Sequence, residues 1–92
     1  MFSDKLLRQL RNDIQIHHLM QVYLKIPLSF RDGFYRFRCP NCLEMNTGIN
    51  PQTNLARCFL CMQNLNPIDI VMVQRKRSFR EAVGFLVKTL KI

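Results

Sequence analysis

Two Cys-x-x-Cys pairs, Cys39/Cys42 and Cys58/Cys61, contain all four cysteines of this 92-residue chain. A Cys-x-x-Cys turn aims two sulfur atoms at one point, and 15 residues separate the two pairs. Two such turns brought together supply four ligands for a tetrahedral Zn²⁺ ion. We therefore predict one structural zinc ion bound by Cys39, Cys42, Cys58 and Cys61. Four thiolates close the metal's coordination shell and leave no position for a reactive water.

Disulfides and redox-active dithiols are the alternatives for paired cysteines. The segment Met1–Lys5 leads into an amphipathic stretch rather than the apolar block of a secretory signal. We therefore expect a cytoplasmic protein, and in a reducing compartment paired cysteines usually bind metal. A redox dithiol normally follows a strand of a βαβ unit, for which this chain has no room. No apolar run reaches the length of a membrane span, so we expect no membrane partner.

The formal net charge is +8, and it rises along the chain. Residues 1–24 carry +1, residues 25–62 carry +3 and residues 63–92 carry +4. Four thiolates around one Zn²⁺ ion would lower the total to about +6. A surplus of this size on a small protein indicates an anionic polymer, most often nucleic acid. The alternative is a basic surface that serves only solubility, but the charges lie close to aromatic residues.

The sequence predicts an α+β fold in which a zinc ribbon, a small antiparallel sheet gripping the metal, is flanked by helices at both ends. We treat residues 1–92 as one domain with a helical segment over 1–26, the ribbon over 33–62 and further helices over 67–91. Ser3 is a candidate cap for the first helix, and Asn12-Asp13 favours a second helix over residues 14–24. Pro27 is expected to end that helix, because its ring disfavours a helical conformation in the residue before it.

Three strands are expected in the ribbon, over residues 34–38, 47–50 and 55–59, with a turn over 50–54. Alternation places Tyr35 and Phe37 on one face of the first strand. It places Phe34, Arg36 and Arg38 on the other face, and it does not decide which of the two sets is exposed to water.

Two local signals define the C-terminal helices. Asn66-Pro67 combines a favoured cap with proline at the first helical position, so an apolar helix should run over 68–74 and pack on the sheet. Asp69 in that helix is expected to accept a backbone hydrogen bond or to pair with an arginine. Ser78 and Glu81 form a capping box before the last helix.

Basic and aromatic residues alternate on the predicted strands. Arginines hold phosphates and exposed rings stack on bases, which is what a surface that binds single strands needs. The candidate nucleic-acid-binding residues are Phe34, Arg36, Arg38, Arg57 and Phe59 on the ribbon, Lys25 and Arg31 near its start, and Arg75, Lys76 and Arg77 between the C-terminal helices. The alternative for each ring is a place in the core, and for the last three residues it is a solvated helix junction. His17 and His18 point in different directions on a helix and are not expected to bind metal.

Several strings of the sequence occur together in one known family. They are Phe37-Arg-Cys39-Pro40-Asn-Cys42, Cys58-Phe59-Leu-Cys61, Ile68-Asp69-Ile-Val-Met72 and Ser78-Phe79-Arg-Glu81-Ala82-Val83. This combination resembles the zinc-binding domain of bacterial-type DNA primases over nearly the whole chain. The family usually has histidine at the position of Cys42, and zinc accepts either ligand. The family's glycines around the second knuckle are replaced here by Leu60, Met62 and Leu65.

The resemblance implies a module that binds single-stranded DNA for template recognition, with a primase polymerase domain, a replicative helicase or another replication protein as partner. Six acidic residues without any cluster cannot form the magnesium site of a polymerase. We therefore expect no enzyme activity from this chain, whether it is a free-standing relative or the first domain of a longer primase. The alternative function is a zinc-stabilised adaptor that binds another replication protein through exposed apolar residues such as Leu60 and Met62.

Overall fold

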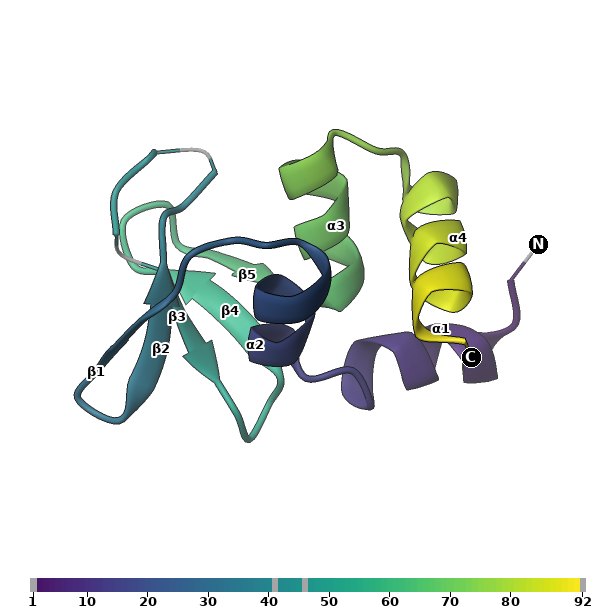
Figure 1. The fold of residues 1–92 in the computed structure, drawn as a ribbon, viewed down its shortest axis with the longest axis horizontal. Coiled ribbons are helices and arrows are strands. Elements are labelled where there is room, and N and C mark those ends of the chain that lie inside the picture. Colours follow the sequence, from purple (N-terminus) through teal and green to yellow (C-terminus); the bar gives the residue numbers. More distant parts are fainter. Residues whose placement is uncertain (1, 41, 46, 92) are drawn as a thin grey trace.

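A computed structural model describes residues 2–40, 42–45 and 47–91 of the protein. The sheet forms one half of the molecule, and helices form the other half, where both ends of the chain lie (Figure 1). This arrangement confirms the predicted α+β fold of a zinc ribbon flanked by N-terminal and C-terminal helices.

The first helix, α1, spans Asp4–Asn12 and begins as its sequence predicts. The hydroxyl of Ser3 accepts a hydrogen bond from the N–H of Leu6 at 3.1 Å, and the acidic side chain of Asp4 lies in the first turn. Both features favour a helix N-terminus, where backbone N–H groups lack partners within the helix.

The second helix starts later than expected. Helix α2 spans Ile16–His18 and continues into the π-helical turn η1 over Leu19–Tyr23. The prediction that Asn12-Asp13 caps a helix from residue 14 is wrong, because Asn12 is the last residue of α1. Helix α2 is capped by a residue far away in the sequence. The side chain of Asn54, rather than that of a neighbouring residue, accepts the hydrogen bond from the N–H of Ile16.

Five antiparallel strands form one sheet in the order β1-β2-β3-β4-β5. Their bounds are Ser29–Arg31, Phe34–Phe37, Thr47–Asn50, Leu55–Cys58 and Gln63–Leu65. The three predicted strands agree with β2, β3 and β4 to within one residue. The edge strands β1 and β5 were not predicted, because three residues are too few to show alternation.

One face of the sheet packs on the helices and the other is open. The packed face carries Phe37, Thr47, Ile49, Ala56 and Cys58, which are all buried. The open face carries a row of directly paired residues, one from each strand in order: Ser29, Arg36, Gly48, Arg57 and Asn64. We call this surface the exposed sheet face. Alternation alone did not show which face of β2 meets water. Because Phe37 is buried, the opposite face, which carries Phe34 and Arg36, is the one exposed to solvent.

The C-terminal helices form as predicted. Helix α3 spans Pro67–Arg75, and its capping box joins Asn66 and Asp69, whose carboxylate accepts a hydrogen bond from the N–H of Asn66 at 3.1 Å. Helix α4 spans Phe79–Leu90 and begins with the capping box of Ser78 and Glu81. Apolar residues of both helices join the N-terminal helices and the sheet in one buried core: Leu10, Ile16, Leu19, Met20, Phe37, Ile49, Ala56, Ile68, Ile70, Val71, Ala82, Val83 and Leu86.

The N-terminal helices are also tied to α3. The guanidinium of Arg75 donates hydrogen bonds to the carbonyl oxygens of Tyr23 and Leu24, at 3.4 and 3.3 Å. These carbonyls belong to the end of η1, where no further helical N–H is available, so the arginine satisfies them. Within the described residues, no helix is both long and apolar enough to cross a membrane.

Candidate metal centre and exposed sheet face

The two cysteine knuckles have the same backbone design. Cys39 follows β2, and Cys58 is the last residue of β4. In each knuckle the residue after the second cysteine turns back: the N–H of Leu43 donates to the carbonyl of Cys39 at 2.9 Å, and that of Met62 to the carbonyl of Cys58 at 2.7 Å. Strands that are neighbours of β3 thus deliver both pairs of cysteines to one end of the sheet.

Leu43 and Met62 adopt a left-handed backbone, with φ of 63° and 60°. Glycine adopts this conformation without steric cost, whereas a residue with a side chain loses about 1 kcal/mol or more there. Both side chains are nevertheless exposed, at 63% and 62%. The protein therefore presents large apolar groups at the two positions where its backbone favours glycine.

The four sulfur atoms are arranged for a single metal ion. All four Sγ atoms lie within 4.8 Å of one another. The distance is 3.8 Å between the sulfurs of Cys39 and Cys61, and 3.7 Å between those of Cys42 and Cys58. A tetrahedron of sulfurs at the Zn–S distance of about 2.3 Å has edges of about 3.8 Å. The residues therefore fit Zn²⁺, and these sulfurs are too far apart for disulfides.

The surroundings of the sulfurs separate their acidities. The N–H of Cys61, 3.3 Å from the sulfur of Cys58, lowers the pKa of Cys58 to about 6, with a further contribution from the N–H of Leu60. Desolvation raises the pKa of Cys61 to about 12, and the neighbouring thiols add to this effect. Cys58 thus ionises readily, whereas Cys61 needs a nearby cation to stabilise its thiolate. This combination is expected of a cluster that binds a metal ion.

The histidines lie outside this cluster. The ring of His17 stacks on that of Tyr35 with a centroid distance of 5.0 Å, and His18 contacts Tyr23 edge to face at 5.8 Å. Among the described residues, the four cysteines form the group of side chains that is placed to hold a metal. Zinc would be held by these cysteines alone, and it would fix the end of β4 to the segment that follows β2.

The fold and this centre together define a Cys₄ zinc ribbon flanked by helices. The chain belongs to the CHC2 zinc finger family, the zinc ribbon of DnaG-type primases, whose family model matches residues 2–92. It is a primase-like zinc module with one zinc site, and the matching domain is the zinc-binding part of primases rather than the catalytic part. A comparison with curated proteins finds no match.

Four of the candidate nucleic-acid-binding residues come together on the exposed sheet face. A cavity of about 300 Å³ there is lined by Phe34, Arg36, Gly48, Ile49, Asn50, Arg57 and Phe59. Arg36 and Arg57 lie on either side of Gly48 in the row across the strands. Asn64 accepts a hydrogen bond from Nη1 of Arg57 at 3.1 Å, which orients that guanidinium. Arg31 lies opposite Phe34 in the β1–β2 hairpin.

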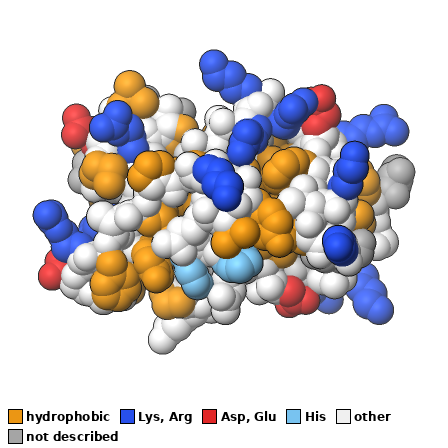
Figure 2. Space-filling model, viewed as in Figure 1, with side chains coloured by type: hydrophobic (Ala, Val, Ile, Leu, Met, Phe, Trp, Pro, Cys, Tyr) orange, Lys and Arg blue, Asp and Glu red, His pale blue; other side chains and the backbone are white. Residues whose placement is uncertain are grey.

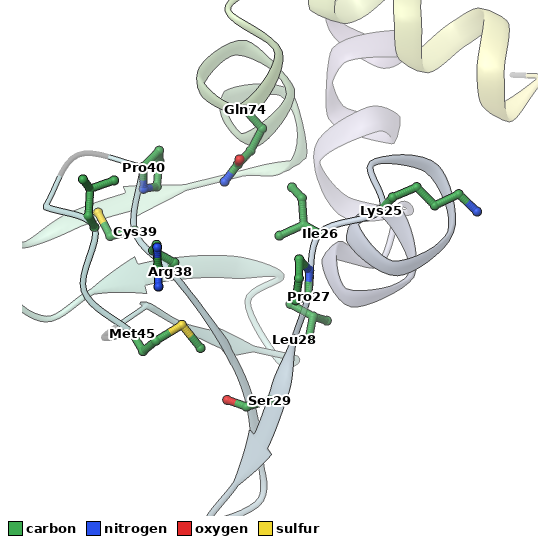
Figure 3. A pocket seen from close by; sticks show the side chains of 11 residues that line it. Lys25, Ile26, Pro27, Leu28, Ser29, Arg38, Cys39, Pro40, Met45 and Gln74 are labelled. Carbon is green, nitrogen blue, oxygen red and sulfur yellow. The ribbon is translucent and has the colours of Figure 1, made fainter.

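Lys25 and Arg38 line a different hollow. Strand β2 ends at Phe37, so Arg38 lies beyond the sheet, next to Cys39. A groove of about 670 Å³ runs between the segment before β1 and the first knuckle, with Gln74 of α3 on the third side (Figure 3). Its walls are mostly apolar, formed by Ile26, Pro27, Leu28, Pro40, Leu43 and Met45.

The basic run between α3 and α4 makes contacts within the protein. Arg75 holds the end of η1, and Lys76 takes the left-handed conformation that ends α3. Arg77 lies 3.7 Å from the carboxylate of Glu81. These positions correspond to the helix-junction alternative, and they lie apart from the cavity between Phe34 and Phe59.

Two residues of the exposed sheet face, Gly48 and Asn64, were not predicted from the sequence. Glycine inside a short strand often marks a place where another group approaches the backbone closely, so Gly48 carried a usable signal. Asn64 carried none, because its strand β5 was not recognised.

Proposed function

We propose that this protein is a primase-type zinc module that binds single-stranded DNA on the exposed sheet face, for template recognition in the replication of a chromosome or a mobile element. The observation that carries this proposal is the placement of Arg36 and Arg57 around Gly48, with Phe34 and Phe59 lining the same cavity. Guanidinium groups neutralise phosphates and release counterions, and rings stack on bases whatever their sequence.

The zinc site and the binding face are mechanically connected. Arg36 lies three residues before Cys39, and Arg57 directly precedes Cys58. A metal bound by all four cysteines would therefore fix the ends of the two strands that carry these arginines. Asn64 adds a hydrogen bond that orients Arg57 before any ligand arrives. A rigid, oriented surface loses less conformational entropy when it binds.

Fluorescence anisotropy with a labelled oligothymidylate tests the proposal. The affinity should fall as salt rises, and Arg36→Gln or Arg57→Gln should weaken binding and reduce the slope of the logarithm of affinity against the logarithm of salt concentration by about 0.7 per lost phosphate contact. Arg8→Gln is a matched control, because it removes the same charge from the exposed side of α1. Absence of binding at low salt, or equal losses in all three variants, would refute the proposal.

An adaptor function is the second candidate, and exposed apolar side chains at the knuckles favour it. Leu43, Leu60 and Met62 are each at least 60% exposed. In the view of Figure 2, hydrophobic side chains reach the surface over the ribbon half of the molecule. Several large apolar side chains kept in water on two adjoining knuckles favour a contact with another protein. The partner would be a primase polymerase domain, a replicative helicase or another replication protein.

A nuclease-treated binding assay with purified candidate partners separates the two functions. If the adaptor function holds, Leu43→Gly with Leu60→Ala should abolish capture of the partner and leave DNA affinity unchanged. Met62 is kept in this variant, because its sulfur lies 3.8 Å from Nη2 of Arg57. Capture that survives both substitutions would count against the knuckles as the contact. In either function, primer synthesis itself would belong to a polymerase domain in the same chain or another one.

A further inference from the structure

We propose that the cavity on the exposed sheet face is a pocket for one unstacked base of the bound strand, held between Phe34 and Phe59 above Gly48. This inference rests on the proposed single-strand binding and adds the ligand group that the cavity receives. Its volume of about 300 Å³ lies at the lower limit of pockets that hold small organic molecules.

Gly48 forms the floor of this pocket. It is the central residue of the row across the sheet, where Arg36 and Arg57 flank it, and it contributes no side chain. A Cβ atom at this position would lie 3.6 Å from Cε2 of Phe59, so the edge of that ring reaches over the glycine. A larger side chain would therefore extend into the space between the arginines.

The two rings supply the apolar walls. Phe34 and Phe59 are 46% and 60% exposed. Neither ring belongs to the buried core, and neither is among the partly buried residues that pack against that core. Covering an exposed phenyl ring with a flat apolar surface is favourable in free energy, because apolar area is removed from water. The faces of a nucleobase provide that surface, whereas a phosphate group does not.

The two arginines supply hydrogen-bond donors at the pocket. The Nε of Arg36 is buried and has no hydrogen-bond partner within the described residues. The guanidinium of Arg57 lies at the opposite side, where Nη1 donates to Asn64 at 3.1 Å and Nη2 contacts the sulfur of Met62, a weak acceptor, at 3.8 Å. A buried donor without an acceptor is unfavourable, and the edges of nucleobases carry carbonyl oxygens and ring nitrogens that accept hydrogen bonds. Apolar walls with donors beside them suit a base rather than a bare anion.

The test compares two strands of equal length and charge, one with bases and one made entirely of abasic sites. The folded, zinc-loaded protein should bind the strand with bases about 5-fold or more tightly, because base–aromatic stacking contributes about 1–3 kcal/mol per base. In Gly48→Val this preference should disappear, while the salt dependence stays, since no charge is lost. Gly84→Ala in α4 is a matched control, because a Cβ there meets nothing within 4 Å.

Valine is a favoured strand residue, so Gly48→Val should keep its zinc and its fold, which metal content and circular dichroism would verify. If it does not, the double variant Phe34→Leu/Phe59→Leu carries the same test, because it retains apolar volume without rings. The base pocket would be refuted if the wild-type protein bound both strands equally. It would also be refuted if the preference for bases persisted in Gly48→Val or in Phe34→Leu/Phe59→Leu. Either result would leave the proposed strand binding intact. Failure to bind either strand at low salt would instead overturn the proposed function and this inference with it.

Discussion

The side chain of Asn54 holds the N–H of Ile16 across 38 residues of sequence, with a distance of 3.2 Å between that nitrogen and Oδ1. Its amide nitrogen also donates to the carbonyl oxygens of Arg11 and Ile14, at 2.8 and 2.6 Å. The turn between β3 and β4 is thereby fixed to the junction of α1 and α2. This turn lies at the end of the sheet opposite the knuckles (Figure 1), so both ends of the ribbon are restrained.

Asn54→Ala should destabilise the protein by about 2–3 kcal/mol, because three backbone groups lose their partner. The residue also has φ of 53°, which alanine tolerates less well than asparagine. Asn54→Gly separates the two effects, since it permits the conformation but cannot form the hydrogen bonds. Urea unfolding of the three proteins would measure the losses. Glycine restoring full stability would show that the bonds contribute little.

Removal of the metal should unfold the ribbon. Without the metal the two knuckles lose the four sulfur–metal bonds that would join them, and small metal-binding domains usually depend on the ion for folding. Metal analysis should give one zinc per chain, and excess chelator should abolish the strand signal in circular dichroism. Cys42→His should retain one zinc and the fold, because a Cys₃His site is equally tetrahedral, while Cys42→Ala should bind zinc more weakly. A fold that persists unchanged after complete loss of zinc would contradict this prediction.

Glycine at either knuckle position should be tolerated or stabilising. Leu43→Gly and Met62→Gly each relieve a left-handed conformation that costs about 1–2 kcal/mol for a residue with a side chain, against a smaller entropic penalty of glycine. Because both side chains are exposed, little buried surface is lost. Thermal unfolding of the zinc-loaded variants should therefore show equal or higher midpoints. A clear decrease in both would mean that these side chains stabilise the knuckles.

Glu81 should contribute to stability in a defined pH range. The N–H of Ser78, followed by its hydroxyl and the Arg77 guanidinium, holds the pKa of Glu81 below its usual value of 4.5. A depressed pKa in the folded state means that the contribution is present above pH 4.5 and is lost as pH falls through the folded value. The stability difference between wild type and Glu81→Gln should thus stay constant from pH 7 towards 4.5 and shrink below it. Thermal unfolding of both proteins at a series of pH values measures this difference. The pH dependence of the zinc site is common to both proteins and cancels in the comparison.

Features with local causes were predictable from the sequence. The spacing of the cysteines, the capping boxes of Asn66 with Asp69 and of Ser78 with Glu81, and the alternation in β2 each depend on neighbouring residues. The start of α2 was not predictable, because its cap is Asn54, distant in sequence. The edge strands were missed for a related reason: three residues pair because their neighbour β2 or β4 is already in place.

The binding face was predictable only in part. Alternation grouped Phe34 with Arg36, but it needed the burial of Phe37 to show which face meets water. The pairing of Gly48 with Arg36 and Arg57 depends on the register of three strands, which no single segment encodes. Arg38 shared the parity of Arg36 and yet lies by the groove of Figure 3, because β2 ends before it.

The glycine between the two arginines has an energetic consequence for the empty protein. The backbones of Arg36 and Arg57 lie two strand spacings apart in that row, about 10 Å. Their positive charges repel each other, and the residue between them, Gly48, carries no opposite charge. Any polyanion that settles there removes this repulsion and thereby favours the native state over the unfolded one. Heparin or polyphosphate in a storage buffer should consequently protect the protein against heat, and concentrated sodium chloride should mask that protection.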